Sequence, residues 1–220
     1  MIANIEPAAA KAGAPIYHLK VVLNGTKPPV WRRLQVPGNA HLGWLHAVIQ
    51  VAMGWTNSHL HQFLIGDLVC ADPASQPEEF DADPPVLDEN KITLAEAASR
   101  QNDVLGYEYD FGDSWHHEVT VEKILSSDPA SATGACCLDG ARACPPEDCG
   151  GTWGYDDLLK ILQNPKHEEH DSMKEWLGRP FDAEQFDRDK VNKHLKRLKW
   201  PRVTEGQLRL VLIARDDYRK

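Results

Sequence analysis

The sequence lacks the features that would place it in a membrane or outside the cell. Its 220 residues contain no apolar run close to the ~20 residues that a membrane-spanning helix needs. Residues 1–15 lack the basic start and apolar stretch of a secretory signal, and we expect them to form a disordered leader. These absences predict a cytoplasmic protein without a membrane partner. The length of 220 residues predicts one domain, over residues 16–220.

Positive charge is also scarce, with 24 Lys and Arg residues against 33 Asp and Glu residues and a formal net charge of -9. Proteins that neutralise nucleic-acid phosphates usually carry a basic excess, so such binding would need a local patch. The segment 188–202 is the one concentrated basic stretch, and its candidate partner-binding residues are Lys193, Lys196, Arg197 and Lys199. They would contact nucleic acid or an acidic protein, or form the solvated face of a surface helix.

The familiar catalytic signatures are missing as well. The chain has no Gly-rich phosphate loop, no G-x-S-x-G elbow and no H-E-x-x-H motif. Two clusters of potential metal ligands remain, one of cysteines and one of histidines with aspartates. Whether the chain is an enzyme stays open at this stage.

Cysteine is limited to five residues, which a cytoplasmic chain would keep as thiols or metal ligands. Four of them lie within fourteen residues, and Cys137, Cys144 and Cys149 with a nearby histidine could bind a structural zinc ion. Their spacing is not that of paired C-x2-C knuckles, so reduced, partly buried thiols are the alternative.

Histidine supplies the second cluster. His59 and His61 are two residues apart, and on a strand this spacing places both imidazoles on one face. Asp113 and His116 follow in the hairpin further along, so a mixed metal site of these four residues is one interpretation. Structural roles are the other, with His61 hydrogen-bonded in a sheet and the Asp113 side chain closing a turn.

Hydrophobic periodicity predicts the fold. Two-residue alternation over 17–23, 30–36 and 107–122 indicates antiparallel strands, and the spacing of Leu42, Leu45, Ile49 and Met53 indicates an amphipathic helix. Asn39 is its expected N-cap and Gly54 its expected end. Thr93 and Glu96 form a capping box for a short helix.

The second half of the chain is expected to differ. Residues 126–152 are rich in Cys, Gly and Pro and predict a long loop, and residues 153–200 predict three helices, the last over 183–199. GQLRLVLIARDD would form a final strand. The expected fold is therefore α+β, an antiparallel meander with one long helix packed on it, β-grasp-like, followed by C-terminal helices.

Several motifs in order resemble one known family. They are VWRRLQVPG, AMGW, SHLHQF, YEYDFGDSWHHEV, CLDG, ACPPEDCGGTWGYDDLL and FDAEQFDRDKVNKHL. Together they resemble the plasmid pRiA4b ORF-3-like family from about Tyr17 to Leu198. The resemblance implies an association with plasmids and mobile elements, and a biochemical function that is not settled for the family. It also implies that the positions of Cys137 and Cys144 recur as a pair more often than that of Cys149.

Some relatives in that family carry a transposon-resolvase label. Recombinases stabilise phosphoryl transfer with several arginines around a serine or tyrosine. Here Arg32 and Arg33 would point to opposite faces of one strand, and Tyr107 and Tyr109 lie in an acidic hairpin, so the chemistry is not supported.

Three hypotheses follow. We favour a non-catalytic binding module for a protein or nucleic-acid partner. The alternatives are a metal-dependent enzyme that uses the His and Asp cluster, and a structural zinc-binding protein that uses the cysteine loop.

Overall fold

The computed structural model describes residues 13–75, 85–126 and 134–199. One sheet contains its eight strands, which are β1 (Ile16–Leu23), β2 (Val30–Pro37), β3 (His61–Ile65), β4 (Leu68–Ala71), β5 (Leu87–Asp88), β6 (Val104–Tyr109), β7 (Trp115–Leu125) and β8 (Cys136–Ala141). The α-helices are α1 (Leu42–Met53), α2 (Leu94–Ala97), α3 (Gly151–Gln163), α4 (His170–Leu177) and α5 (Arg188–Leu195).

The sheet confirms the α+β class and the largely antiparallel pairing. Its strand order is β5-β4-β3-β6-β7-β1-β2-β8, and among these pairs only β4 with β5 is parallel. Three pairs of consecutive strands are antiparallel neighbours, β1 with β2, β3 with β4 and β6 with β7, but β7 pairs with β1 in the centre of the sheet, so the order is not a simple meander. The β-grasp comparison is not confirmed, because five helices accompany an eight-stranded sheet. Nor is a single long helix, since α3 has 13 residues and α1 has 12.

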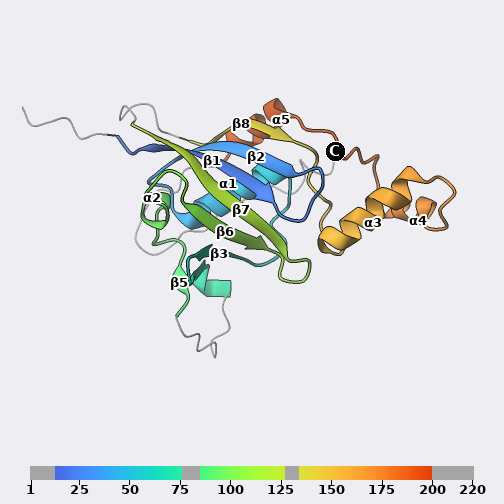
Figure 1. Ribbon diagram of the computed structural model, residues 1–220, viewed down its shortest axis with the longest axis horizontal. Coiled ribbons are helices and arrows are strands. Elements are labelled where there is room, and N and C mark those ends of the chain that lie inside the picture. The colour runs from blue at the N-terminus through green and yellow to red at the C-terminus, as the bar shows by residue number, and fades with distance from the viewer. Residues whose placement is uncertain (1–12, 76–84, 127–133, 200–220) are drawn as a thin grey trace, which may run out of the picture.

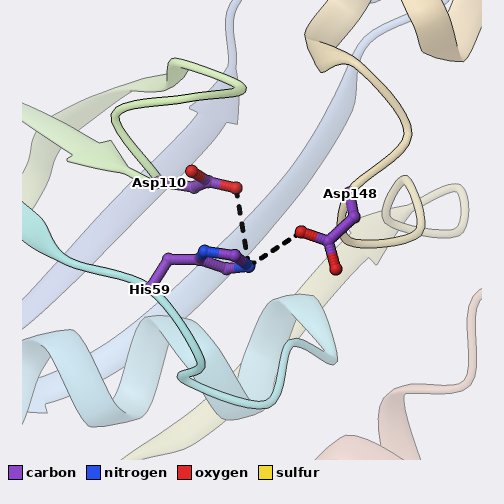
Figure 2. A group of neighbouring side chains, drawn as sticks. All are labelled: His59, Asp110 and Asp148. Carbon is purple, nitrogen blue, oxygen red and sulfur yellow. Dashed lines mark ion pairs between the residues drawn. The ribbon is translucent and has the colours of Figure 1, made fainter.

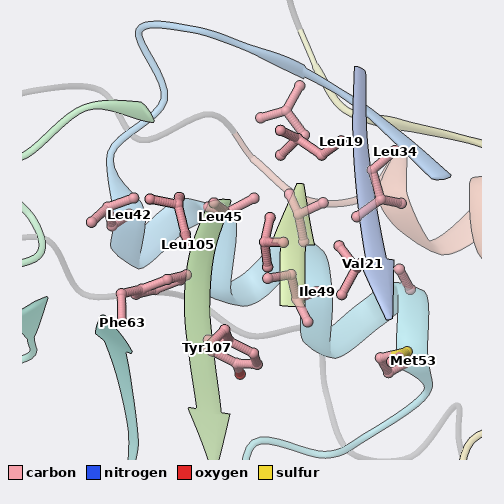
Figure 3. Close-up of a cluster of buried hydrophobic side chains, with 14 of the residues drawn as sticks. Leu19, Val21, Leu34, Leu42, Leu45, Ile49, Met53, Phe63, Leu105 and Tyr107 are labelled. Atoms are coloured by element: carbon pink, nitrogen blue, oxygen red, sulfur yellow. The ribbon is translucent and has the colours of Figure 1, made fainter. Parts of the chain in front are cut away.

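Helix α1 packs across one face of the sheet, and this contact forms the core (Figure 3). Leu42, Leu45 and Ile49 are fully buried and lie against strand residues such as Leu19, Val21 and Leu105. We expected an amphipathic helix with one buried apolar stripe. All twelve residues of α1 are buried instead, so the helix is covered on every side. The reason is that α5 packs on α1 from another side.

The ends of the helices follow local chemistry in most places. Gly54 ends α1 with φ 100°, the left-handed conformation that glycine adopts most readily, as predicted. The capping box of Thr93 and Glu96 at the start of α2 is also present. Asn39 is not the N-cap of α1. The helix starts after His41, whose side chain makes no capping hydrogen bond.

The second half of the chain differs from the prediction in two places. The expected loop over 126–152 contains strand β8, which pairs with β2 at the edge of the sheet. The last helix was expected from Ala183, but α5 starts at Arg188, where the Asp187 side chain accepts a hydrogen bond from the backbone N–H of Lys190. The predicted final strand, residues 206–217, lies outside the described residues, as does most of the predicted leader.

The arrangement in space separates the helices into two groups (Figure 1). Helices α1 and α5 lie behind the sheet in this view, whereas α3 and α4 pack on each other to the right of the sheet, past the ends of its strands. Asn192 of α5 exchanges two hydrogen bonds with the backbone of Cys137, which fixes α5 beside β8. No helix in the described part of the chain combines the length and the apolar character needed to cross a membrane.

Candidate functional site

His59, Asp110 and Asp148 form a compact group of potential ligands (Figure 2). The Nε2 atom of His59 lies 3.0 Å from Oδ1 of Asp148 and 3.6 Å from Oδ2 of Asp110. One ligand atom from each residue lies within 4.8 Å of the other two. We call these three residues the His59 group. It joins three segments far apart in sequence: the α1–β3 connection, the end of β6 and the loop before α3.

Local backbone conformation positions both carboxylates. Asp110 follows β6 with φ 58°, and its Oδ1 atom accepts a hydrogen bond from the backbone N–H of Gly112, which closes the hairpin turn. Asp148 has φ 60° in the loop before α3. Aspartate tolerates this left-handed conformation better than most residues with a Cβ atom. The turn leaves the Oδ2 atom of Asp110 to face His59.

The surroundings of His59 are asymmetric. Its ring contacts the edge of Tyr109, and its Nε2 atom is buried yet makes no hydrogen bond. The nearby Asp148 oxygen therefore lies off the axis of the ring N–H. Asp110 is buried, whereas the Asp148 side chain is 68% exposed. One carboxylate of the His59 group is thus fixed in the protein and the other is open to solvent.

His61 does not share the site of His59. Strand β3 begins at His61, so His59 precedes the strand and the expected two-residue alternation does not apply to it. His61 instead stacks on His46 of α1, with ring centroids 3.4 Å apart. Its Nε2 atom lies 2.9 Å from Oε2 of the buried Glu89. The predicted chelation by His59 and His61 is therefore not formed in this structure.

His46 belongs to a buried network that the sequence reading missed. Its Nε2 atom lies 2.7 Å from Oδ1 of Asn57, and its Nδ1 atom lies 2.8 Å from the hydroxyl of Tyr107. Gln50, one helical turn later, donates to the same hydroxyl. Because an amide oxygen only accepts, Nε2 carries the proton of the neutral ring and Nδ1 accepts from Tyr107. The sequence did offer a signal for this network. His46 and Gln50 are polar residues four apart in an otherwise apolar helix, a spacing that places both on one face.

Burial disfavours the charged forms of three residues in and beside this network. Desolvation, with the adjacent His61 ring, holds the pKa of His46 well below its ordinary value. Burial likewise raises the pKa of Tyr107 well above its ordinary value. His117, buried on β7 near Tyr107, has its pKa lowered by burial to about 3. We call His46, Gln50, Asn57, His61, Glu89, Tyr107 and His117 the buried network.

The other two predicted ligands, Asp113 and His116, face partners outside the His59 group. Asp113 accepts a hydrogen bond from the backbone N–H of Gly150 through its Oδ2 atom, and so joins the β6–β7 turn to the start of α3. His116 is exposed on β7 and lies 3.6 Å from Glu108 on the neighbouring strand. The predicted four-residue set is therefore not assembled, and Asp110 takes the place expected for Asp113.

The cysteines lie apart from that group. All five described cysteines are free thiols, and the metal-ligand group found in the described residues contains none of them. Cys137 is buried in β8 and its thiol donates to the backbone oxygen of Asp139. Burial raises the pKa of Cys137 to about 11 and of Cys149 to about 12, and raises that of Cys144 further. These thiols are protonated near neutral pH, and zinc would have to displace their protons.

A cleft of about 1080 Å³ opens beside the His59 group. Its walls are the end of α1 with the following residues, the loop over 143–147, and the segment from the end of α4 into α5. Ser58 and Glu147, the sequence neighbours of His59 and Asp148, line it. Trp55, Phe181 and Phe186 give it aromatic walls, so the cleft combines flat apolar surfaces with charged groups.

Arg32 lines this cleft and is only 3% exposed. Its Nε atom donates to the carbonyl of Ala52 at the end of α1, and one terminal nitrogen donates to the carbonyls of Trp31 and Ala141. The guanidinium lies over the ring of Phe186 at 4.4 Å. The remaining terminal nitrogen, Nη2, has no hydrogen-bond partner within 13–75, 85–126 and 134–199. Arg33 instead pairs with Glu122, so the two arginines point to opposite faces, as expected.

The predicted basic patch lies outside this cleft. Lys193, Lys196, Arg197 and Lys199 are all exposed at the end of α5 and beyond it, and none of them lines the cleft. Lys190 and His194, on the same helix, do line it. Partner binding by the basic patch therefore stays a prediction. The side of α5 that carries Lys190 and His194 faces the cleft instead.

Comparison with known proteins agrees with this fold. "Uncharacterized protein y4hQ" of Sinorhizobium fredii is 38% identical over 194 residues, which cover 86% of this chain and 96% of the relative. The crystal structure of "Protein of Unknown Function MM3350" from Methanosarcina mazei Go1 has a TM-score of 0.70 and 35% identity, over 81% of this chain and 98% of the other. The model for the plasmid pRiA4b ORF-3-like protein matches residues 15–190, and the chain therefore belongs to that family.

Proposed function

We propose that the protein is a non-catalytic binding module whose cleft takes an extended segment of a partner protein and holds one of its carboxylates on Arg32. The observation that carries this proposal is the buried Arg32 guanidinium, whose Nη2 atom has no hydrogen-bond partner among the described residues. A buried charge costs several kcal/mol when it is left without compensation. A carboxylate that accepts a hydrogen bond from Nη2 supplies the compensating negative charge through a charge-assisted hydrogen bond.

The groups around Arg32 do not provide that carboxylate. Cys137 and Cys144 interact electrostatically with Arg32, but burial raises the pKa of both thiols and keeps them protonated. Glu147 lines the cleft, but its oxygens accept hydrogen bonds from Thr56 and from the hydroxyl of Tyr109. Within the described residues, no Asp or Glu forms an ion pair with Arg32. The positive charge is therefore available to a ligand.

A protein partner fits the cleft better than a nucleic acid. Glu147, Asp182 and Asp187 line it together with Arg32, and three carboxylates would repel a chain of phosphates. The aromatic and proline side chains that line it include Trp55, Pro145 and Phe181, which are surfaces that peptide-binding grooves commonly use. The net charge of -9 also disfavours a polyanion. A cytoplasmic location is part of this proposal.

Selection of peptides from a displayed random library on the immobilised full-length chain tests the proposal. We expect enriched peptides to share an Asp or Glu, and their affinity to fall at least tenfold when that residue becomes Asn or Gln. Trp176→Ala in the cleft wall should weaken binding. Trp153→Ala is the matched control, because Trp153 is exposed on α3 and does not line the cleft. Enrichment without an acidic residue, or equal loss in both variants, would refute the proposal.

A further inference from the structure

The His59 group has the geometry of a small metal centre. Two ligand atoms that are each about 2.0–2.2 Å from one ion, at angles of about 90–110°, are separated by about 3.0–3.5 Å. The distances from Nε2 of His59 to the two carboxylates are 3.0 and 3.6 Å. Figure 2 shows both carboxylates turned toward this one nitrogen from different segments.

Hydrogen bonding does not account for this convergence. Nε2 of His59 is inaccessible to solvent and has no hydrogen-bond partner, although a carboxylate oxygen lies only 3.0 Å away. A buried polar nitrogen without a partner is costly and uncommon in proteins. An ion bound to that nitrogen would have a carboxylate oxygen of both Asp110 and Asp148 close by. The Oδ1 atom of Asp110 is held by the turn, so Oδ2 is the oxygen presented to an ion.

We propose that His59, Asp110 and Asp148 bind one divalent transition-metal ion of the manganese or zinc type. One imidazole and two carboxylates form a donor set for Zn²⁺ or Mn²⁺, which accept mixed nitrogen and oxygen ligands. Three protein ligands leave at least one coordination position for water or a ligand group. The exposed Asp148 side chain places that open position on the solvent side.

This site differs from the zinc site that the cysteines would form, and it does not depend on peptide binding in the cleft. Its donors are nitrogen and oxygen only, and its residues are outside the cleft lining. Co²⁺ separates the two possibilities, because thiolate ligands give an intense near-ultraviolet charge-transfer band that imidazole and carboxylate ligands do not give.

Titration of the chelator-treated full-length chain with Co²⁺, Mn²⁺ and Zn²⁺ tests the proposal by calorimetry and absorption. We expect one equivalent to bind, with no thiolate band for Co²⁺, and affinity to fall at least tenfold in Asp148→Asn and in His59→Gln. The exposed side chain of Asp148 makes its variant safe for folding. His116→Gln is the matched control, an exposed histidine outside the group, and should bind as the unaltered chain does.

Three results would overturn the proposal. One is no saturable binding of any of the three ions. Another is Co²⁺ binding with a thiolate band, which would move the site to the cysteines. The last is unchanged affinity in both Asp148→Asn and His59→Gln, with circular dichroism showing that each variant is folded.

Discussion

His59 and His61 are separated by one residue, yet they lie in opposite environments. His61 stacks on His46, and its Nε2 atom faces the buried Glu89, so both contacts lie inside the buried network. His59 faces one fixed and one exposed carboxylate, and its nitrogen has no hydrogen bond. The difference shows that burial and partners, more than residue type or spacing, separate a structural histidine from one that can bind a ligand.

The largest expected effect is the loss of folding stability in acid, which comes from the buried histidines. His46 and His117 have depressed pKa values when folded and ordinary values near 6.5 when unfolded, so the unfolded chain binds more protons as pH falls below 6.5. Stability is therefore full above pH 6.5 and is lost toward the folded pKa, about 3 for His117. Two such groups give a slope of about 2.7 kcal/mol per pH unit between about pH 5.5 and 4.

Urea denaturation at several pH values measures that slope. Carboxylates also lose stabilising contacts in acid, so the comparison should include His117→Asn, in which the slope should fall by about 1.4 kcal/mol per pH unit. Equal slopes in the two proteins would show that His117 is already protonated in the folded state or exposed to water.

Removal of one hydroxyl should have the next largest effect. In Tyr107→Phe, Gln50 loses an acceptor and His46 loses a donor, both inside the protein. We expect the free energy of unfolding to fall by about 2–4 kcal/mol, because two buried polar groups are left unpaired. His116→Gln, on the exposed face, should change it by less than about 0.5 kcal/mol. A loss below about 1 kcal/mol in Tyr107→Phe would mean that water replaces the hydroxyl.

The smallest effect on stability is expected at the His59 group. Asp148→Asn should leave the free energy of unfolding within about 0.5 kcal/mol of the unaltered chain when a chelator is present, because the side chain is exposed and asparagine accepts φ near 60°. With Zn²⁺ added, the melting temperature of the unaltered chain should rise and that of the variant should not. A rise of equal size in both would contradict the assignment.

Periodicity was enough to predict much of the fold. The alternation of β1, β2, β6 and β7, the burial of Leu45 and Ile49 against the sheet, and the cap at Gly54 follow from local sequence alone. Strand β8 escaped prediction because its CCLDGA sequence has few strand formers. It forms because an edge of the sheet, at β2, offers it hydrogen bonds. The order β3-β6-β7-β1 is a long-range outcome that local patterns do not encode.

The candidate site was only partly predictable. The prediction that His59 and His61 share one face assumed a strand that includes both residues. Strand β3 begins only at His61, and the His61 side chain lies away from the His59 group. Asp110 and Asp148 could be noted as turn or loop acids, but the sequence did not connect the two with each other, since aspartate is common in turns. Their approach to His59 depends on how the loop before α3 returns to the β6–β7 turn. The role of Arg32 depends likewise on burial, which the alternation of β2 indicated but did not explain.

A crystal of the full-length chain grown with Mn²⁺, measured near the manganese absorption edge, tests the central claim most directly. We expect a single strong anomalous difference peak bounded by Nε2 of His59, Oδ2 of Asp110 and Oδ1 of Asp148, with the rings of His46 and His61 still stacked. A peak among Cys137, Cys144 and Cys149, or at His61 and Glu89, would contradict the distinction drawn between the two histidines, as would the absence of any peak.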